Sequence, residues 1–301
     1  MIEDYPGYPM GFVANTDLLL KLINLIALPL NDQCEFDEIV LHFDEKREEL
    51  WWSNKCTDGN YLVNFGHATY DYFDECWGEG EVALSASSLL GILQEGKKDK
   101  VDQILLGVCP ELGTHEIIFD DGEFIQSSLA VASEINTHKP RVDYARNNSN
   151  YPYKLDNDYI PILPEALEYG GTINARDLKT VVATGRKLRP KRYPMDFRIK
   201  PKPPLTEPLT VTFNGRKPNQ CIEIKIKGKS LRPPNVDISQ IISNKLEAPA
   251  LALNGNITLR LSMDNTSPIY LLKEEKHRYY TNGEMKAGML IGTKKNLPKA
   301  R

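Results

Sequence analysis

The same order of expected helices and strands occurs twice along this chain of 301 residues, on either side of a long irregular stretch. In the first half, capping side chains at 15–17 precede a leucine-rich run, which predicts a helix that ends before Pro29. Alternating apolar residues between turns predict strands, and serines within 85–88 predict the start of a second, short helix. The expected strands of this half are 38–43, 50–53, 61–65, 81–84, 103–108 and 115–119, and its second helix is 89–94.

Periodicity is lost from about residue 126 to 164, where Asn, Tyr and Pro are frequent, as is typical of a long connector. Beyond it, the expected helices are 174–188 and 237–246, and the expected strands are 209–213, 221–227, 256–262 and 269–272. Two similar units in series indicate an internal duplication with an α+β fold. We therefore expect an N-terminal domain over 1–125, a connector over 126–165, a C-terminal domain over 166–285 and a basic tail over 286–301.

The two halves carry opposite charge. Residues 1–150 contain 10 basic and 27 acidic side chains, a net charge of −17, whereas residues 151–301 contain 27 basic and 14 acidic ones, a net charge of +13. Such a basic half indicates either a polyanion-binding surface confined to one region or attraction between opposite ends of neighbouring copies. Solvated lysines without a binding role are the third explanation.

The expected helix 174–188 is amphipathic in a way that bears on this choice. At 100° per residue its cations fall on one side, while its aliphatic residues fall on the other. The cations are Arg176, Lys179, Arg186 and Lys187, and the aliphatic residues are Leu178, Val181, Val182 and Leu188. A helix that docks by its apolar side and presents four cations is suited to a phosphate backbone, which it would bind without reading bases. A solvated face that binds nothing is the alternative.

Sequence motifs exclude several classes of protein. No apolar run reaches the roughly 18 residues of a membrane span, and the acidic N-terminus lacks a basic leader, so we expect a cytoplasmic protein. Five cysteines without a CxxC pair and five dispersed histidines predict neither a disulfide framework nor a metal site. Phosphate-loop, dinucleotide, nucleophile-elbow and zinc-protease motifs are absent from the sequence, so we expect no cofactor.

One catalytic outline is present. Asp196 followed by Glu223 and Lys225 has the spacing of magnesium-dependent nucleases, in which two carboxylates hold the metal and the lysine supports the attacking water. In an alternating strand over 221–227, the same Glu and Lys also fit a plain solvent face, with isoleucines facing the core. Both interpretations stay open at the level of sequence.

Several stretches of the chain resemble sliding clamps of the proliferating cell nuclear antigen type. The closing strands of that family are similar to 257–264, 267–272 and 278–280 here, and its last helix is similar to 241–245. Further similarity is found at 73–75, 81–85, 89–93 and 172–179. The chain is longer than usual for the family, and Thr281-Asn282-Gly283 replaces the usual alanine-proline ending, which is typical of a divergent clamp such as a viral or archaeal one.

The resemblance implies two clamp domains per chain, with three chains in a ring whose sheets lie outside and whose helices line the hole. It implies a non-enzymatic processivity factor that encircles double-stranded DNA and tethers a DNA polymerase and other replication proteins, with a clamp loader as a further partner. The residues that would line the hole are Lys21, Lys97, Lys98, Lys100, Arg176, Lys179, Arg186, Lys187 and Lys245. The opposite charges of the two halves would also suit head-to-tail contacts.

Clients of the family insert a short hydrophobic motif between the interdomain connector and the C-terminal strand. The positions that correspond to that pocket are Ile160, Ile162, Leu163, Pro268, Tyr279 and Tyr280. Pro268 also fits a plain strand end, and the two tyrosines also fit ordinary sheet positions. Two alternatives to the clamp remain: a monomeric DNA- or RNA-binding accessory protein that uses the same basic helix, and the magnesium-dependent nuclease.

Overall fold

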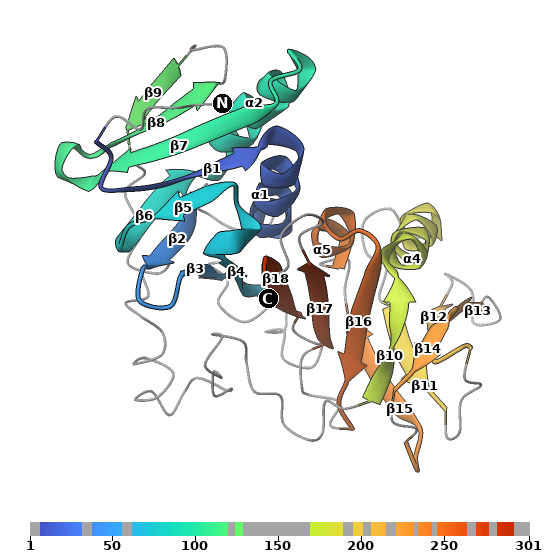
Figure 1. Ribbon diagram of the computed structural model, residues 1–301. Coiled ribbons are helices and arrows are strands. Elements are labelled where there is room, and N and C mark those ends of the chain that lie inside the picture. Colours follow the sequence, from blue (N-terminus) through green and yellow to red (C-terminus); the bar gives the residue numbers. More distant parts are fainter. Residues whose placement is uncertain are drawn as a thin grey trace, which may run out of the picture.

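The computed structural model describes most of the chain and repeats one order of elements in its two halves (Figure 1). The described residues are 7–31, 38–55, 62–119, 124–128, 169–188, 195–200, 206–214, 221–231, 234–242, 246–263, 269–276 and 282–291. In each half one strand and one helix are followed by five strands, a second helix and three strands. Helix labels follow Figure 1.

The elements of the first half begin with a strand, Met10–Asn15, where the sequence predicts only an N-terminal tail. The strands are β1 (Met10–Asn15), β2 (Glu38–Asp44), β3 (Glu49–Lys55), β4 (Leu62–Thr69), β5 (Glu75–Trp77), β6 (Gly80–Ser85), β7 (Gln103–Cys109), β8 (Thr114–Phe119) and β9 (Phe124–Ser128). The helices are α1 (Thr16–Asn31) and α2 (Ala86–Lys98), with short 3-10 turns η1 (Tyr70–Tyr72) and η2 (Pro110–Leu112).

The second half contains the corresponding elements in the same order. The strands are β10 (Tyr169–Asn174), β11 (Met195–Ile199), β12 (Leu209–Asn214), β13 (Cys221–Ile226), β14 (Gly228–Ser230), β15 (Ile238–Ile242), β16 (Asn256–Leu261), β17 (Ile269–Lys276) and β18 (Glu284–Ile291). The helices are α4 (Ala175–Leu188) and α5 (Glu247–Ala252). Both long helices start alike, because Asn15 and Asn174 each accept a hydrogen bond from the backbone N–H two residues on, at 3.0 and 2.9 Å.

The sheets show the same repetition. One half supplies the five-stranded order β5-β1-β7-β8-β9, and the other supplies the matching order β14-β10-β16-β17-β18. The four-stranded orders β4-β3-β2-β6 and β13-β12-β11-β15 also correspond. Antiparallel pairing of β18 with β4 joins one unit of each half into a nine-stranded sheet, from Met285 opposite Ala68 to Ile291 opposite Leu62. At this seam Gly288 leaves room for the Phe65 ring, whose atoms would lie 2.4 Å from an added Cβ.

The structure differs from the sequence-based expectation in one element and at two boundaries. The expected helix 237–246 is wrong, since Ile238–Ile242 forms strand β15, in which Ile238, Gln240 and Ile242 are buried and the residues between them are not. This period of two matches pairing with β11, and the helix begins only at Glu247. Strand β9 crosses the expected connector boundary at 125, and β18 continues the apolar alternation through 286–291, which we had assigned to the tail.

Helix α1 continues past Pro29, although the sequence predicts that it ends before this residue. A side chain of strand β4 replaces the backbone hydrogen-bond donor that proline lacks. Proline has no backbone N–H to give to the carbonyl of Leu25, four residues earlier. The Asn64 side chain on β4 donates to the carbonyl oxygens of Leu25 at 2.8 Å and Ile26 at 2.9 Å. Its own oxygen accepts from Trp52 Nε1 at 3.1 Å. Asn64 is fully buried and satisfies three groups at once.

Replacing Asn64 with alanine is expected to lower the free energy of unfolding by about 3 kcal/mol, because it leaves the Trp52 N–H and the Leu25 carbonyl buried without partners. Urea unfolding of Asn64→Ala beside Asn24→Ala measures this. Asn24 lies half-buried on the same helix, and its side chain makes no hydrogen bond within the described residues. Equal losses in the two variants would show that Asn64 has no special role.

A buried histidine predicts how stability depends on pH. His115 on β8 is 4% exposed, its Nδ1 has no hydrogen-bond partner in the described residues, and burial lowers its pKa below the usual 6.5. The unfolded chain therefore takes up a proton that the folded chain does not. We expect the free energy of unfolding to be highest above pH 6.5 and to fall as the pH is lowered, by at most about 1.4 kcal/mol per pH unit for this group. Urea unfolding from pH 7.5 to 5 should show a shallower dependence for His115→Leu.

Candidate nucleic-acid interface

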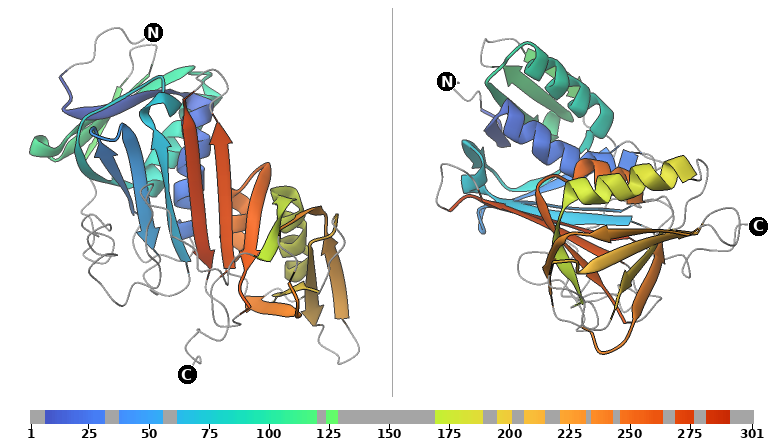
Figure 2. Two further views of the ribbon diagram at one scale, coloured as in Figure 1. Left: turned by 60° about the horizontal axis from the view of Figure 1, so that its bottom comes forward. Right: turned by 90° about the vertical axis from the view of Figure 1, so that its right-hand side faces the viewer.

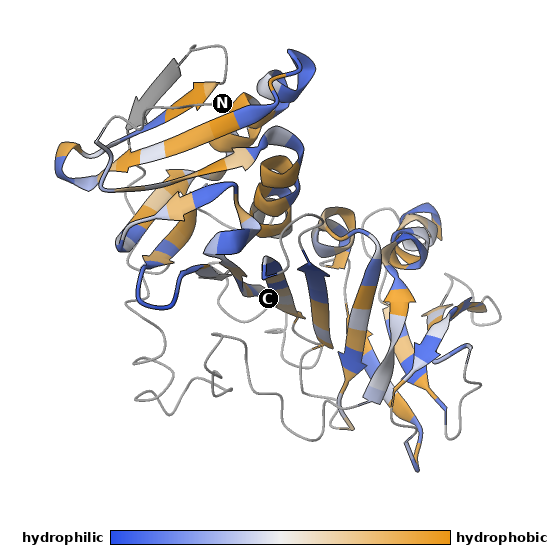
Figure 3. Ribbon diagram, in the orientation of Figure 1, coloured by the Kyte–Doolittle hydropathy of each residue, from blue (hydrophilic) through white to orange (hydrophobic). Residues whose placement is uncertain are grey.

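Helix α4 is built so that its aliphatic side is buried and its cations are exposed. Leu178, Val181 and Val182 are at most 4% exposed and pack into the core, as the sequence predicted. On the other side, Arg176, Arg186 and Lys187 are exposed and Lys179 is half-exposed. Figure 3 shows the hydrophobic side of α4 turned to the sheet and the hydrophilic side turned away. The helix predicted over 174–188 is confirmed.

The helices α2, α1, α5 and α4 form one layer on the same face of the sheets (Figure 2). Helix α1 packs against α2 on one side and α5 on the other, and α4 packs against α5. Residues from both halves therefore contribute to a single helical surface. The repeated order of elements explains this, since each half places its two helices at the same points of the chain.

Positive charge on this layer is concentrated on α4. That helix carries four cations and one carboxylate, Asp177. The other three helices together carry three cations and three carboxylates, namely Lys21, Lys97, Lys98, Asp17, Glu95 and Glu247. The sequence predicts a basic surface spread over all helices, but within the described residues the excess of cations belongs to α4 alone.

Several of the predicted cations are held by carboxylates. Lys97 of α2 lies 2.8 Å from Asp17 of α1, and this hydrogen bond lowers the pKa of Asp17. Arg186 of α4 lies 2.7 Å from Glu247 of α5. Two of the helix-to-helix contacts in the layer thus carry an ion pair, each of small energetic value at an exposed site. Lys98 pairs within α2, 3.0 Å from Glu95, and that hydrogen bond raises the pKa of Lys98.

The remaining predicted site residues have different outcomes. Lys21 is exposed on α1, and Lys100 is exposed just after α2 with a left-handed backbone (φ 63°). Neither makes an ion pair within the described residues. The other predicted positions lie outside the described residues: Lys245, Ile160, Ile162, Leu163, Pro268, Tyr279 and Tyr280.

The sheet face opposite the helices carries aromatic residues that the sequence analysis did not name. Phe65 of β4 and Tyr270 of β17 stack with ring centroids 6.1 Å apart, and Leu290 of β18 is paired with Tyr270. Their strand neighbours Leu271 and Met289 belong to the core on the helix side, so strand alternation places these three on the opposite face. The apolar alternation of β18 is the signal that points to Leu290, but the sequence analysis assigns residues 286–291 to a tail.

The carboxylates of the nuclease outline have other partners or lie apart. Asp196 on β11 accepts hydrogen bonds from Arg198 Nε at 2.7 Å and Ser239 Oγ at 2.6 Å. Thr212 on β12 lies between Asp196 and Glu223 in the register, so the two carboxylates are two strands, or about 10 Å, apart. Lys225 pairs with Glu207 at 3.2 Å. Among the described residues, no group of three His, Cys, Asp or Glu side chains is arranged to hold a metal ion.

Two strands lie at sheet edges, of which only β9 is absent from the sequence-based expectation, since β13 matches the expected strand 221–227. β9 ends the five-stranded sheet and β13 ends the four-stranded sheet, and they lie at opposite ends of the molecule (Figure 1). On β13, Ile222 is 39% exposed although it points to the same side as the buried Phe213 opposite it. This leaves an apolar side chain half-covered at a sheet edge.

Solved structures with the same fold are sliding clamps. The chain superposes on proliferating cell nuclear antigen from A. fulgidus, solved with the C-terminal region of FEN-1, with a TM-score of 0.68, 15% identity and coverage of 97% of this chain and 100% of that one. It matches the same antigen of Thermococcus kodakaraensis with a TM-score of 0.64, 16% identity and coverage of 94% and 99%. It also matches the Helicobacter pylori beta clamp bound to a DNA ligase peptide, with a TM-score of 0.60, 13% identity and coverage of 97% and 68%.

At the level of sequence, no family model and no curated protein matches this chain. Within the described residues, no helix is long and apolar enough to cross a bilayer. The fold is the α+β clamp fold that the sequence analysis expected.

Proposed function

We propose that this protein is a non-enzymatic DNA sliding clamp: three copies form a ring that encircles duplex DNA and tethers a DNA polymerase and other replication proteins. Its place of action would be the cytoplasm, at sites of DNA replication. The observation that carries the proposal is the pairing of β18 with β4. In the repeat, β9 corresponds to β18 and β13 corresponds to β4. The chain therefore has two edge strands, β9 and β13, that match the two partners of this joint but do not pair with each other within one copy.

Pairing of β9 from one copy with β13 of the next would repeat the internal seam between chains. Such a contact is heterologous, and it closes into a ring when the rotation per copy permits. Charge supports the head-to-tail direction: Lys225, Lys227 and Lys229 are exposed on and beside β13 and β14, while the first half of the chain is acidic. The domains would then be the two repeated units, with residues 126–165 containing the connector.

The helix layer would form the wall of the hole, with α4 of each copy as the main contact to phosphates. Binding through phosphates alone has no sequence preference, and it permits sliding while the ring prevents escape. Clients would bind on the opposite sheet face at the predicted connector and C-terminal residues; Tyr270 and Leu290 on that face are buried in the single chain. The antigen solved with part of FEN-1 and the beta clamp solved with a ligase peptide support this role.

Light scattering during size-exclusion chromatography, at low and moderate salt, tests the ring. We expect a mass of three times 34.1 kDa. Loading onto nicked circular and linear plasmid separates topology from affinity, since a closed ring stays on circles at high salt and leaves when they are linearised. A single-chain mass in both salts, with equal retention on the two DNAs, would favour the monomeric nucleic-acid binder. Strand cleavage in Mg²⁺ that Glu223→Ala abolishes would favour the nuclease.

A further inference from the structure

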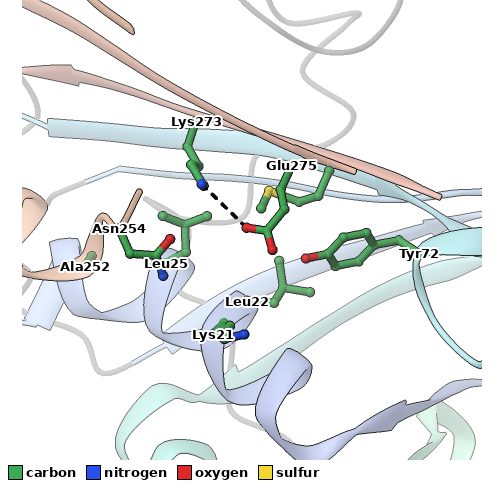
Figure 4. Close-up of a pocket in the computed structure, with 9 residues that line it drawn as sticks. Lys21, Leu22, Leu25, Tyr72, Ala252, Asn254, Lys273 and Glu275 are labelled. Carbon is green, nitrogen blue, oxygen red and sulfur yellow. Dashed lines mark ion pairs between the residues drawn. The ribbon is translucent and has the colours of Figure 1, made fainter. Parts of the chain in front are cut away.

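A small, open pocket lies where the two halves of the chain meet (Figure 4). Its walls come from α1, from Tyr72 of η1, from the end of α5 and Asn254 beyond it, and from β17 and β18. It therefore lies on the helix side of the nine-stranded sheet, beside the seam at which β18 pairs with β4.

The unusual residue in this pocket is Lys273. Strand β17 turns Ile269 and Leu271 into the core, and Lys273 follows them on the same face with only 9% of its surface exposed. An ammonium group has three N–H donors, and burying it is costly unless acceptors are supplied. The nearest carboxylate oxygen, Glu275 Oε2, forms an ion pair with Lys273 Nζ at 3.6 Å, a distance too long for a hydrogen bond. No described residue forms a hydrogen bond with Lys273, so its donors are available to a bound group.

Other polar groups converge on the same space. Lys21 of α1 lines it from the first half, and Asn254 lines it from the second. The one opposing charge in the lining is Glu275, so the lining has a net charge of +1. Tyr72 also faces Glu275, and burial together with that charge raises the pKa of Tyr72, which keeps its hydroxyl neutral.

We propose that this pocket binds a phosphate group, held between Lys21 of the first half and Lys273 of the second. Two ammonium groups and an amide on different walls supply donors from several directions, which suits a tetrahedral oxyanion. A bound phosphate would supply the acceptors that Lys273 lacks and would link the two halves beside their seam. Its source is either free phosphate, including the phosphate of a nucleotide, or the backbone of a nucleic acid that passes the adjacent helix layer.

Methionine methyl NMR tests the site directly, because Met285 lines the pocket and Met263 is an exposed internal control outside it. Inorganic phosphate is titrated against chloride at constant ionic strength. We expect a saturable shift of the Met285 signal, assigned with Met285→Leu, and a constant Met263 signal. Lys273→Gln should weaken the apparent affinity about tenfold or more, the effect of losing one charge-assisted hydrogen bond.

Lys21→Gln keeps the test valid if Lys273→Gln does not fold, because Lys21 is exposed, and it should weaken binding in the same direction. Lys46→Gln in the turn between β2 and β3, which does not line the pocket, should leave binding unchanged. Titration with a short duplex separates the sources: a Met285 shift with duplex that phosphate reverses assigns the backbone, and a shift with phosphate alone assigns the free anion. No shift with either ligand, or a shift retained in both lysine variants, would overturn the proposal. Neither outcome depends on ring assembly, which light scattering tests separately.

Discussion

Ile222→Asp is expected to convert the assembly from three times 34.1 kDa to single chains. Ile222 lies on the edge strand β13 and is 39% exposed in the single chain, so the substitution leaves the fold of that chain intact. In the proposed joint with β9 the same side chain would be covered, and a carboxylate there would be buried without a partner. A cost of about 3 kcal/mol corresponds to roughly a hundredfold in the association constant of each joint.

The matched control is Ile241→Asp. Ile241 is 41% exposed, belongs to the same four-stranded sheet, and lies on its other edge strand, β15. The substitution Ile241→Asp introduces the same charge at nearly the same exposure but away from the proposed joint. The mass and the processivity of this variant should therefore equal those of the wild type. Both variants are compared by light scattering and by circular dichroism. A trimeric Ile222→Asp protein, or dissociation by both substitutions alike, would place the joint elsewhere.

The second large effect is expected from the cations of α4. Arg176→Gln, Lys179→Gln and Lys187→Gln combined should abolish most of the affinity for duplex DNA and reduce polymerase processivity without unfolding the protein. Each cation that no longer neutralises a phosphate should reduce the slope of log K against log salt concentration by about 0.9. Arg186 is left in place because its ion pair with Glu247 joins α4 to α5. Duplex binding at several salt concentrations and single-round primer extension measure the two effects.

A control triple removes the same charge from the faces turned away from the helices. Ile199 and Glu275 face the helix side, so strand alternation turns the next residues, Lys200 and Lys276, to the opposite face. Lys46 lies in the turn between β2 and β3. Changing these three to glutamine should leave the salt slope and processivity near the wild-type values. If the two triple variants lose affinity equally, overall charge and not α4 governs binding, and our assignment of the wall fails.

The sequence was sufficient wherever a pattern is local. The leucines of α1 and the two-sided character of α4 repeat with the helical period, so each helix could be predicted without knowing its neighbours. The exposed cations of α4 followed from the same periodicity. Short strands were less secure, since Ile241 and Ile242 fit a helix and a strand equally well until β11 is known to lie beside them.

The tertiary structure decided what depends on residues far apart in the chain. Asn64 extends α1 past Pro29 from another strand, and Asp17 and Glu247 pair with Lys97 and Arg186 of neighbouring helices, which no local pattern reveals. The seam between Met285 and Ala68 joins positions more than two hundred residues apart, and it also creates the pocket of Lys273. Periodicity within one element determines which side of it is buried, but pairing between elements depends on which surfaces meet, and only the folded chain brings those surfaces together.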